Sequence, residues 1–433
     1  MYLSWLAVPE LQSRFDLGDA AGRNGLARWC RQNGSGARGL RARTRKAWEW
    51  FRAIPPSYSS DLPGCNLVGY SRGVLGMGEH VRMTAHAMQE AGIPFDVVDF
   101  SLGLGKTRQD SGLARHLSGS ARRRCTIMHV NADQMVRALW HYGPRFFASR
   151  YIVGYWAWEL PLLPEVWRPV LGLVDEVWAP SEFIRAAIQP FTSKPVVHMP
   201  LCVELPPFKR LPRHAFGWKD TDFVFGFAFD CHSWLSRKNP AAIVKAFNAA
   251  FNEGETARLV LKAMHAQESD PHWRALVELV ADDPRITLIN EVWTRERLLA
   301  FMAAIDAYVS LHRSEGFGRS PAEAMLLGKP VIVTGYSGTE DFCRNDNSLL
   351  VGFDLVAVAD GDYPHSQRQS WAEPNCHEAS RQMRRLFEDR DLAAEIGKNG
   401  RKTIEEEFCG HATGRRYRAR LEEIGMLNEQ EQK

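Results

Sequence analysis

Paired cysteines and long apolar runs are both missing from this sequence of 433 residues, and each absence excludes a class of protein. The eight cysteines are scattered singly, without a CxxC pair or a Cys/His spacing typical of zinc, so neither a disulfide scaffold nor a metal site is indicated. No apolar run approaches the ~18 residues that a membrane-spanning helix needs. The first residues also lack the basic start and apolar core of a signal peptide, so the sequence predicts a cytoplasmic protein.

Net charge is also scarce, at +3 overall, but it is unevenly distributed. Residues 1–60 hold ten Arg/Lys against four acidic residues, whereas the remainder holds 44 against 47. A nucleic-acid binder that is basic throughout does not show this distribution, so no nucleic-acid partner is expected. The sequence therefore predicts a nearly neutral body with a basic N-terminal extension at residues 1–60.

Aromatic residues accompany the cations of this extension. Trp48, Trp50 and Phe51 follow the basic run Arg41–Lys46, as in a helix that lies in a membrane interface. Residues 38–54 are therefore predicted to contact an anionic membrane surface, which would place the protein peripherally on the inner face of the cytoplasmic membrane. A basic helix packed on the acidic remainder and a flexible extension are the alternatives.

From Asn66 onward, short apolar runs typical of strands alternate with helical patterns, which favours α/β architecture with parallel sheets covered on both faces. A second such series starts near Thr221, and Lys209–Trp218 is the best boundary between the two. We therefore predict an N-terminal domain at 61–213 and a C-terminal domain at 214–410. A final helix at about 411–433 is expected to pack back on the N-terminal domain.

Ser310–Met325 is the most informative stretch. A strand is expected to end near Leu311, and Gly316 and Gly318 then allow the backbone to approach a ligand closely. A helix is predicted to begin with Ser320 as its cap and Pro321 in its first turn, and its positive end would attract an anion. Because ligands of open α/β sheets bind beyond the carboxyl ends of the strands, this loop is a candidate binding site.

Two glutamates of this stretch are spaced as E-x7-E. Glu315 lies between a strand end and a glycine loop, where no structural pattern requires an acid. Glu323 has two interpretations, because it either completes a capping box with Ser320 or contacts a ligand.

A second loop places two cations directly before a helix. Asn239 is the expected cap of that helix and Pro240 its first residue, and Arg237 and Lys238 immediately precede them. Cations at the positive end of a helix are unfavourable unless an anion neutralises them, and a diphosphate would do so. A solvent-exposed pair without a ligand is the alternative.

A third loop, Gly69–His80, joins a strand to a helix through several glycines. It lacks the full G-x-G-x-x-G spacing, which argues against a nicotinamide cofactor. Gly76 and Gly78 are compatible with a close approach to phosphate, and equally with a tight turn that needs glycine.

Together these loops resemble the retaining glycosyltransferases of family 4, which have the GT-B fold of two Rossmann-like αβα domains facing a cleft. The resemblance covers about residues 64–425, and its most specific element is the E-x7-E pattern of Glu315–Glu323 preceded by Arg237 and Lys238. Further segments are similar to bacterial polysaccharide and lipopolysaccharide enzymes of mannosyltransferase type. The basic extension does not match the family.

The resemblance implies metal-independent transfer of a hexose, with a lean toward mannose, from a GDP- or UDP-linked sugar and without a cofactor. The implied acceptor is a glycan or a lipid-linked sugar in cell-surface polysaccharide synthesis. Arg237 and Lys238 would neutralise the diphosphate leaving group, Glu315 would hold hydroxyls of the donor sugar, and Glu323 would hold the ribose.

Glycines would bring backbone groups to the donor from both domains. Gly316, Phe317 and Gly318 would touch the donor sugar and phosphate. Gly76 or Gly78 would contact the diphosphate from the N-terminal domain, so that the site forms only on closure.

Residues of the N-terminal domain are implied on the acceptor side. His129, at a predicted strand end, would contact the donor sugar or the acceptor hydroxyl, unless it is a packed structural histidine. Trp156, Trp158 and Glu159 are expected to bind the acceptor, with stacking of tryptophan rings on sugars. Tryptophans at apolar strand ends are more often core residues, and this is the alternative interpretation of Trp156 and Trp158.

Two other functions stay open at this point. A GT-B sugar-nucleotide epimerase would turn over the donor without any acceptor. A non-catalytic module would bind a glycan or a nucleotide sugar without turnover.

Overall fold

The computed structural model describes residues 62–73, 75–100, 112–143, 146–147 and 150–427, together with seven single positions between 14 and 29. The predicted membrane contact at residues 38–54 lies outside the described residues and stays a prediction. Within the described part, none of the helices has both the length and the apolar character that crossing a bilayer requires.

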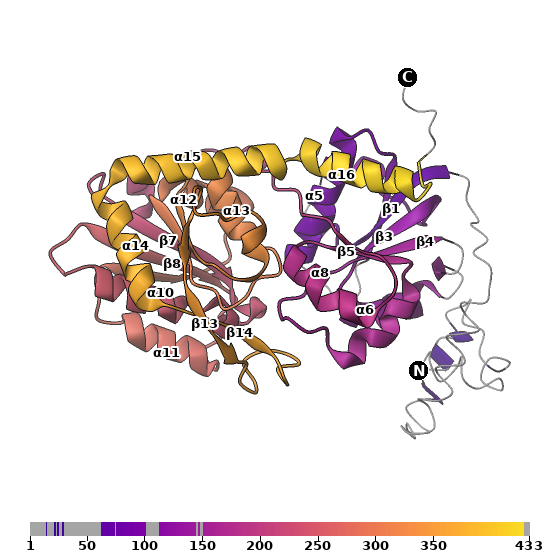
Figure 1. Ribbon diagram of the computed structural model, residues 1–433, viewed down its shortest axis with the longest axis horizontal. Coiled ribbons are helices and arrows are strands. Elements are labelled where there is room, and N and C mark those ends of the chain that lie inside the picture. Colours follow the sequence, from indigo (N-terminus) through magenta and orange to yellow (C-terminus); the bar gives the residue numbers. More distant parts are fainter. Residues whose placement is uncertain are drawn as a thin grey trace.

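A six-stranded parallel sheet forms the N-terminal half, with the strand order β2-β1-β3-β4-β5-β6 (Figure 1). Its strands are β1 (Leu62–Gly69), β2 (Phe95–Asp99), β3 (Arg123–His129), β4 (Tyr151–Tyr155), β5 (Glu176–Ala179) and β6 (Val196–His198). Their side chains are mostly buried, as expected where helices cover both faces of a parallel sheet.

A second six-stranded parallel sheet forms the C-terminal half, with the order β12-β11-β10-β7-β8-β9. Its strands are β7 (Phe223–Asp230), β8 (Ala257–Met264), β9 (Ile286–Asn290), β10 (Ala307–Ser310), β11 (Val331–Thr334) and β12 (Leu349–Val351). Two parallel sheets with covering helices confirm the predicted α/β fold class.

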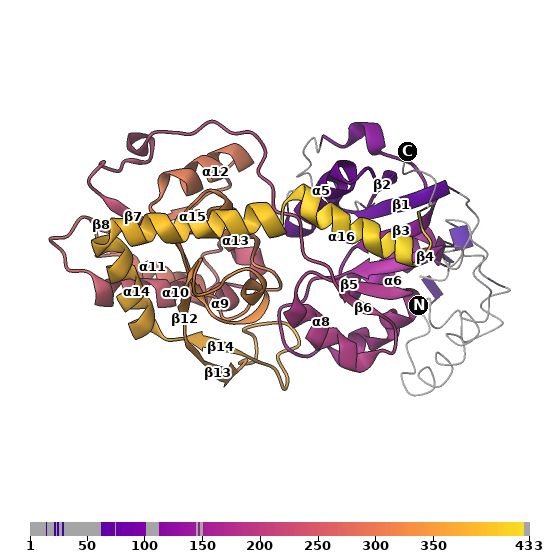
Figure 2. The same ribbon diagram turned by 45° about the horizontal axis from the view of Figure 1, so that its top comes forward.

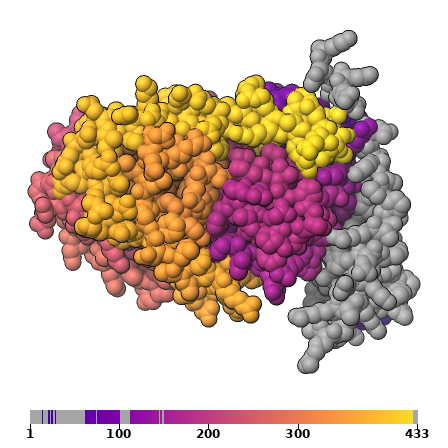
Figure 3. Space-filling model, viewed as in Figure 1, coloured from indigo at the N-terminus to yellow at the C-terminus, as the bar shows by residue number. Residues whose placement is uncertain are grey.

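Helices flank both sheets and join the two halves (Figures 1 and 2). They are α5 (Gly76–Glu90), α6 (Ala132–Tyr142), α8 (Glu182–Ile188), α9 (Leu235–Lys238), α10 (Pro240–Ala250), α11 (Pro271–Val280), α12 (Arg295–Ala304), α13 (Arg319–Leu326), α14 (Cys376–Glu388), α15 (Arg390–Glu407) and α16 (Gly410–Glu423). In the space-filling view, α15 and α16 (yellow) run along one edge of both halves (Figure 3).

The last helix, α16, packs on α5 of the N-terminal half. A Cβ on Gly414 would lie 2.3 Å from the carbonyl oxygen of Ala87, so the two helices approach at a glycine. Arg418 donates to the carbonyl of Ala91 at 2.7 Å, and Arg420 is 2.5 Å from the buried carboxylate of Glu176. The chain thus returns from the C-terminal half to the N-terminal one.

An antiparallel hairpin, β13 (Phe353–Ala357) with β14 (Ser370–Pro374), extends from the C-terminal half toward the N-terminal half (Figure 1). The alternation of apolar strands with helices does not predict it, because β13 is half-exposed and has no buried apolar run. This hairpin supplies one side of the contact between the halves.

Candidate active site

The central loop of the site lies beyond the carboxyl ends of the C-terminal strands. After β10 the chain passes through Glu315 to Gly318, and α13 then begins at Arg319. Gly318 has a φ of +95°, and a Cβ there would lie 2.4 Å from a methyl carbon of Thr339, so the position requires glycine. The N-cap of this helix is Gly318, two residues before the predicted cap Ser320.

Glu315 lies between the two predicted cations. Its carboxylate is 2.5 Å from Nζ of Lys238 and 3.1 Å from Nη1 of Arg237. Arg237 also donates to the carbonyl of Ser314 at 2.7 Å. Burial raises the pKa of the Glu315 carboxyl, but the charges of Lys238 and Arg237 outweigh this effect and hold the pKa well below its ordinary value. The three side chains form one buried ion cluster.

The sequence predicted that Arg237 and Lys238 need an anion to neutralise them, and the cluster shows that part of this charge comes from the protein itself. Pro240 is the first residue of α10 and Asn239 its N-cap, as predicted, so Arg237 and Lys238 do precede a helix, but they are also the last two residues of the short helix α9. Both side chains are largely buried, so the interpretation as a solvent-exposed pair is wrong. The anion that their position demands is present within the protein as Glu315. The carboxylate of Glu159 from the other half also attracts both cations.

Glu323 is buried and binds an arginine from another helix. Its two carboxylate oxygens accept hydrogen bonds from Arg295 of α12, at 2.9 and 2.6 Å. Because α13 begins at Arg319, Ser320 lies inside the helix and no side chain caps the N-terminus. The capping-box interpretation is therefore wrong, and an ion pair takes its place.

The start of α5 faces this site from the N-terminal half. A Cβ on Gly78 would lie 2.2 Å from the carbonyl oxygen of Gly73, so Gly78 is required by the preceding turn, whereas nothing lies within 4 Å of a Cβ on Gly76. Burial raises the pKa of Glu79 in the first turn of α5, but the charge of Arg319, with those of Arg82 and Arg295, lowers it overall.

Arg319 is a site residue that the sequence analysis missed. Its Nη1 donates to the carbonyl of Cys202 at 3.3 Å, while its buried Nη2 has no hydrogen-bond partner among the described residues. It begins α13 in one half and influences Glu79 in the other. The sequence contained a signal for Arg319, because a cation directly before a predicted helix start was also the reason for selecting Arg237 and Lys238.

His129 ends β3 and is completely buried. Within the described part of the chain, both of its ring nitrogens lack a hydrogen-bond partner. Its ring lies 4.7 Å from that of His80 and 5.4 Å from that of Tyr155. Burial lowers the pKa of His129 to about 3, so it is neutral at physiological pH.

The buried His129 should make stability depend on pH. Its folded pKa of about 3 lies below the unfolded value of about 6.5, so the unfolded chain binds the proton first and stability falls as the pH drops below 6.5. His129→Leu should therefore remove about 2 kcal/mol of the stability loss between pH 7.5 and 5. Urea unfolding at both pH values tests this, and the exposed His377→Gln should leave the loss unchanged. Equal losses for wild type and His129→Leu would contradict it.

The predicted acceptor residues take different places. Trp156 is buried in the core of the N-terminal sheet and presents no open ring face. Trp158 is also buried, but in a small cluster at the boundary between the halves with Tyr363 and Trp371 of the hairpin segment. Glu159 accepts a hydrogen bond from Tyr363 at 2.6 Å, and its backbone carbonyl accepts one from Ser314 Oγ.

The halves are in direct contact at the glycine loop. Ser181 at the start of α8 donates to the carbonyl of Gly316 at 2.5 Å. A Cβ on Gly316 would lie 3.0 Å from the carbonyl oxygen of Trp158, and one on Gly338 would lie 2.3 Å from that of Gly316. Phe317 turns into the core, where it packs on Phe342. The predicted loop 316–318 therefore lies at the contact between the two halves.

A groove of about 660 Å³ lies beside this contact. One wall comes from the segment after β4, with Glu165 and Arg168, and the other from the hairpin loop, with His365 and Arg368. Gln369 closes one end by donating to the carbonyl of Leu162 at 2.7 Å. The volume falls in the range of about 300–1,000 Å³ typical of small-molecule sites.

Comparisons with known proteins agree with this architecture. A sequence profile described as "Glycosyl transferases group 1" matches residues 232–403, which include Arg237, Lys238 and both glutamates of E-x7-E. No curated protein matched the sequence.

Several solved structures share the fold. HepE of Anabaena, in complex with UDP and glucose, has a TM-score of 0.61 and 16% identity over 83% of this chain and 100% of its own. Sucrose-phosphate synthase of Thermosynechococcus elongatus has a TM-score of 0.59 and 17% identity over 83% of this chain and 98% of its own. The lipopolysaccharide outer core galactosyltransferase WaaB has a TM-score of 0.56 and 12% identity over 83% of this chain and 99% of its own. The chain has the GT-B fold.

Proposed function

We propose that the protein is a retaining glycosyltransferase that moves a hexose from a nucleotide-diphosphate sugar to a glycan or lipid-linked acceptor. The buried cluster of Arg237, Lys238 and Glu315 carries this proposal. It lies beyond the carboxyl ends of parallel strands, in the segment that matches the glycosyltransferase profile.

The chemical step needs charge stabilisation more than a protein nucleophile. The bond between the anomeric carbon and the phosphate oxygen breaks, and negative charge develops on the departing diphosphate. Arg237 and Lys238 stabilise that charge, because they are already positioned and shielded from water. The acceptor oxygen bonds to the anomeric carbon on the same face, and its proton passes to the leaving phosphate. No metal is required for these steps.

Arg319, the first residue of α13 after the glycine loop, offers a further cation for the diphosphate. Its Nη2, which has no hydrogen-bond partner in the part of the chain that the structure describes, lies at the start of α13, and open space surrounds Gly76 at the start of α5. A diphosphate there would accept hydrogen bonds from Arg319 and from backbone N–H groups at the start of α5. Glu315 and Glu323 then remain for hydroxyls of the donor sugar and ribose.

The acceptor occupies the groove between the halves. Tyr363 links this groove to the ion cluster, since it comes two residues before His365 of the groove wall and the Arg237 guanidinium carbon lies 5.9 Å from the centre of its ring. Because one wall belongs to the hairpin of the donor half, the groove exists only when the halves are in contact. Acceptor binding therefore favours the closed arrangement.

A thermal-shift panel of nucleotide sugars tests the donor. A ligand at about 100 times its Kd adds about 2.7 kcal/mol of stability, which corresponds to a rise in Tm of roughly 5 °C or more for domains of this size. GDP-mannose follows from the sequence resemblance, and UDP-glucose from a second HepE structure, which was solved in complex with UDP-glucose. If no nucleotide sugar in a panel covering UDP, GDP, dTDP and ADP donors raises the Tm, the proposal is wrong.

Turnover separates the three functions. A glycosyltransferase releases nucleoside diphosphate in proportion to sugar added to an acceptor, and excess EDTA should leave that rate unchanged. Conversion of the donor into an isomeric nucleotide sugar without acceptor would indicate an epimerase. Binding without either reaction would indicate a non-catalytic module.

A further inference from the structure

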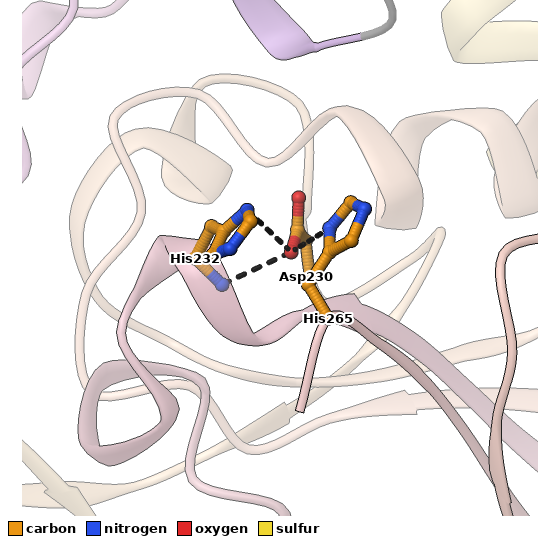
Figure 4. Close-up of side chains that lie close together, drawn as sticks. All are labelled: Asp230, His232 and His265. Carbon is orange, nitrogen blue, oxygen red and sulfur yellow. Dashed lines mark hydrogen bonds and ion pairs between the residues drawn. The ribbon is translucent and has the colours of Figure 1, made fainter. Parts of the chain in front are cut away.

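Three potential metal ligands converge at the ends of two neighbouring strands of the C-terminal sheet (Figure 4). Asp230 is the last residue of β7, His232 follows it after one residue, and His265 directly follows β8. Their ligand atoms all lie within 4.8 Å of one another. The Cys/His spacing of the sequence does not indicate this trio, because only the pairing of Asp230 with Met264 in the sheet brings its members together.

The two imidazoles point at one carboxylate oxygen. Nδ1 of His265 is 2.9 Å from Oδ1 of Asp230, a hydrogen bond, whereas Nδ1 of His232 is 3.9 Å from the same oxygen, which is too long for one. The rings are nearly parallel, with centroids 4.4 Å apart. Figure 4 shows both ring nitrogens directed at the oxygen between them.

The backbone fixes two of the three ligands. The N–H of His232 donates to Oδ1 of Asp230 at 3.0 Å, so the carboxylate caps the short turn that follows β7. His265 has a φ of +59°, which is uncommon for a residue other than glycine and directs its side chain back toward Asp230. His232, with 64% of its side chain exposed, is free to rotate and opens the trio to solvent.

Two imidazole nitrogens and one carboxylate oxygen form the ligand set of many divalent transition-metal sites. With metal–ligand bonds of about 2.0–2.2 Å, tetrahedral ligand atoms lie roughly 3.4 Å apart. The present separations of 2.9 and 3.9 Å lie on either side of that value, so small side-chain rotations suffice. Solvent would fill the remaining position. The ammonium of Lys262 is attracted to Asp230 and opposes the ion, which makes weak rather than structural binding the expectation.

We propose that Asp230, His232 and His265 bind a divalent transition-metal ion, with Zn²⁺ as the favoured ion. The ion joins the ends of β7 and β8. It takes no part in the transfer step, and the site is independent of the proposed function.

Calorimetry with ZnCl2 on the full chain, stripped with EDTA and dialysed, tests this site. Wild type should bind one ion that His265→Ala loses or binds at least about tenfold more weakly, since even outer-shell changes cost 10- to 100-fold. His272→Ala, an exposed histidine outside the trio, should bind as wild type does. Lys262→Met should bind the ion more tightly.

Co²⁺ gives a second readout that separates this site from cysteine thiols. The wild-type protein should show the weak visible absorption of nitrogen and oxygen ligation, and His232→Ala should reduce it while its far-UV circular dichroism stays unchanged. Equal Zn²⁺ binding by wild type and His265→Ala, an intense thiolate absorption, or no binding at all would each overturn the proposal.

Discussion

Glu315→Ala should lower the free energy of unfolding by about 3–5 kcal/mol. Arg237 and Lys238 are both largely buried, and this substitution removes the carboxylate that lies 3.1 and 2.5 Å from them. Two buried cations would then face each other with only the more distant carboxylate of Glu159 as a counter-charge. Breaking a buried ion pair by removing one partner is costly because the remaining charge stays desolvated.

The loss should be smaller at alkaline pH. Burial already lowers the pKa of Lys238, although Glu315 opposes this effect, and removal of Glu315 should lower that pKa further. The unfolded chain then binds a proton that the folded variant does not, so stability of the variant rises with pH. Urea unfolding at pH 7 and pH 9 should show the deficit of Glu315→Ala shrinking.

A surface carboxylate provides the matched control. Glu405 is 2.7 Å from Arg401 on α15, but both side chains are about half exposed. Glu405→Ala should therefore cost only about 0.3–0.5 kcal/mol at either pH. A Glu315→Ala protein within 0.5 kcal/mol of wild type would show that solvent screens the cluster, contrary to its burial.

Much of the fold could be predicted from the sequence because the parallel strands are buried on both faces. β7 is an example, since seven of its eight residues are buried and form a continuous apolar run that few other structures accommodate. The hairpin β13–β14 could not be predicted in this way. Its first strand is half-exposed, and its position depends on contacts with a distant segment through Tyr363 and Gln369.

Only those features of the site that depend on neighbouring residues in the sequence could be predicted. Arg237, Lys238 and Glu315 could be selected because each sits next to a strand end or a helix start, yet their pairing spans 77 residues and depends on β7 lying beside β10. Glu323 shows the limit most clearly. Its local capping signature is overridden because the N-cap is Gly318, two residues before Ser320, and because Arg295 supplies a bidentate partner.

Lys238→Ala should reduce the transfer rate about 10²- to 10³-fold, the usual cost of removing one preorganised group that stabilises developing charge. The effect should fall mainly on kcat, because the charge on the diphosphate grows as the bond to the sugar breaks. Steady-state rates with the nucleotide sugar that raises the Tm most would measure it.

Lys238→Ala should lower the stability of the fold less than removal of Glu315 or Arg237 would. Glu315 keeps Arg237 as its partner at 3.1 Å, so no charge is left unpaired in the cluster. Arg237→Ala is a poorer test, because Arg237 also holds the backbone carbonyls of Ser314 and Ser233, and its removal would disturb both loops. A loss of activity without a fall in Tm therefore isolates the electrostatic role of Lys238.

Lys245→Ala is the matched control, since Lys245 is an exposed lysine on α10 outside the ion cluster and should turn over at the wild-type rate. If Lys238→Ala kept near wild-type transfer with a donor that stabilises the protein, Lys238 would have no part in leaving-group departure. In that case the positive charge needed at the diphosphate would have to come from Arg237 or from Arg319, whose buried Nη2 is unpartnered among the described residues. A large loss of kcat in Arg319→Ala would then assign that role to Arg319, and a wild-type kcat would leave it to Arg237.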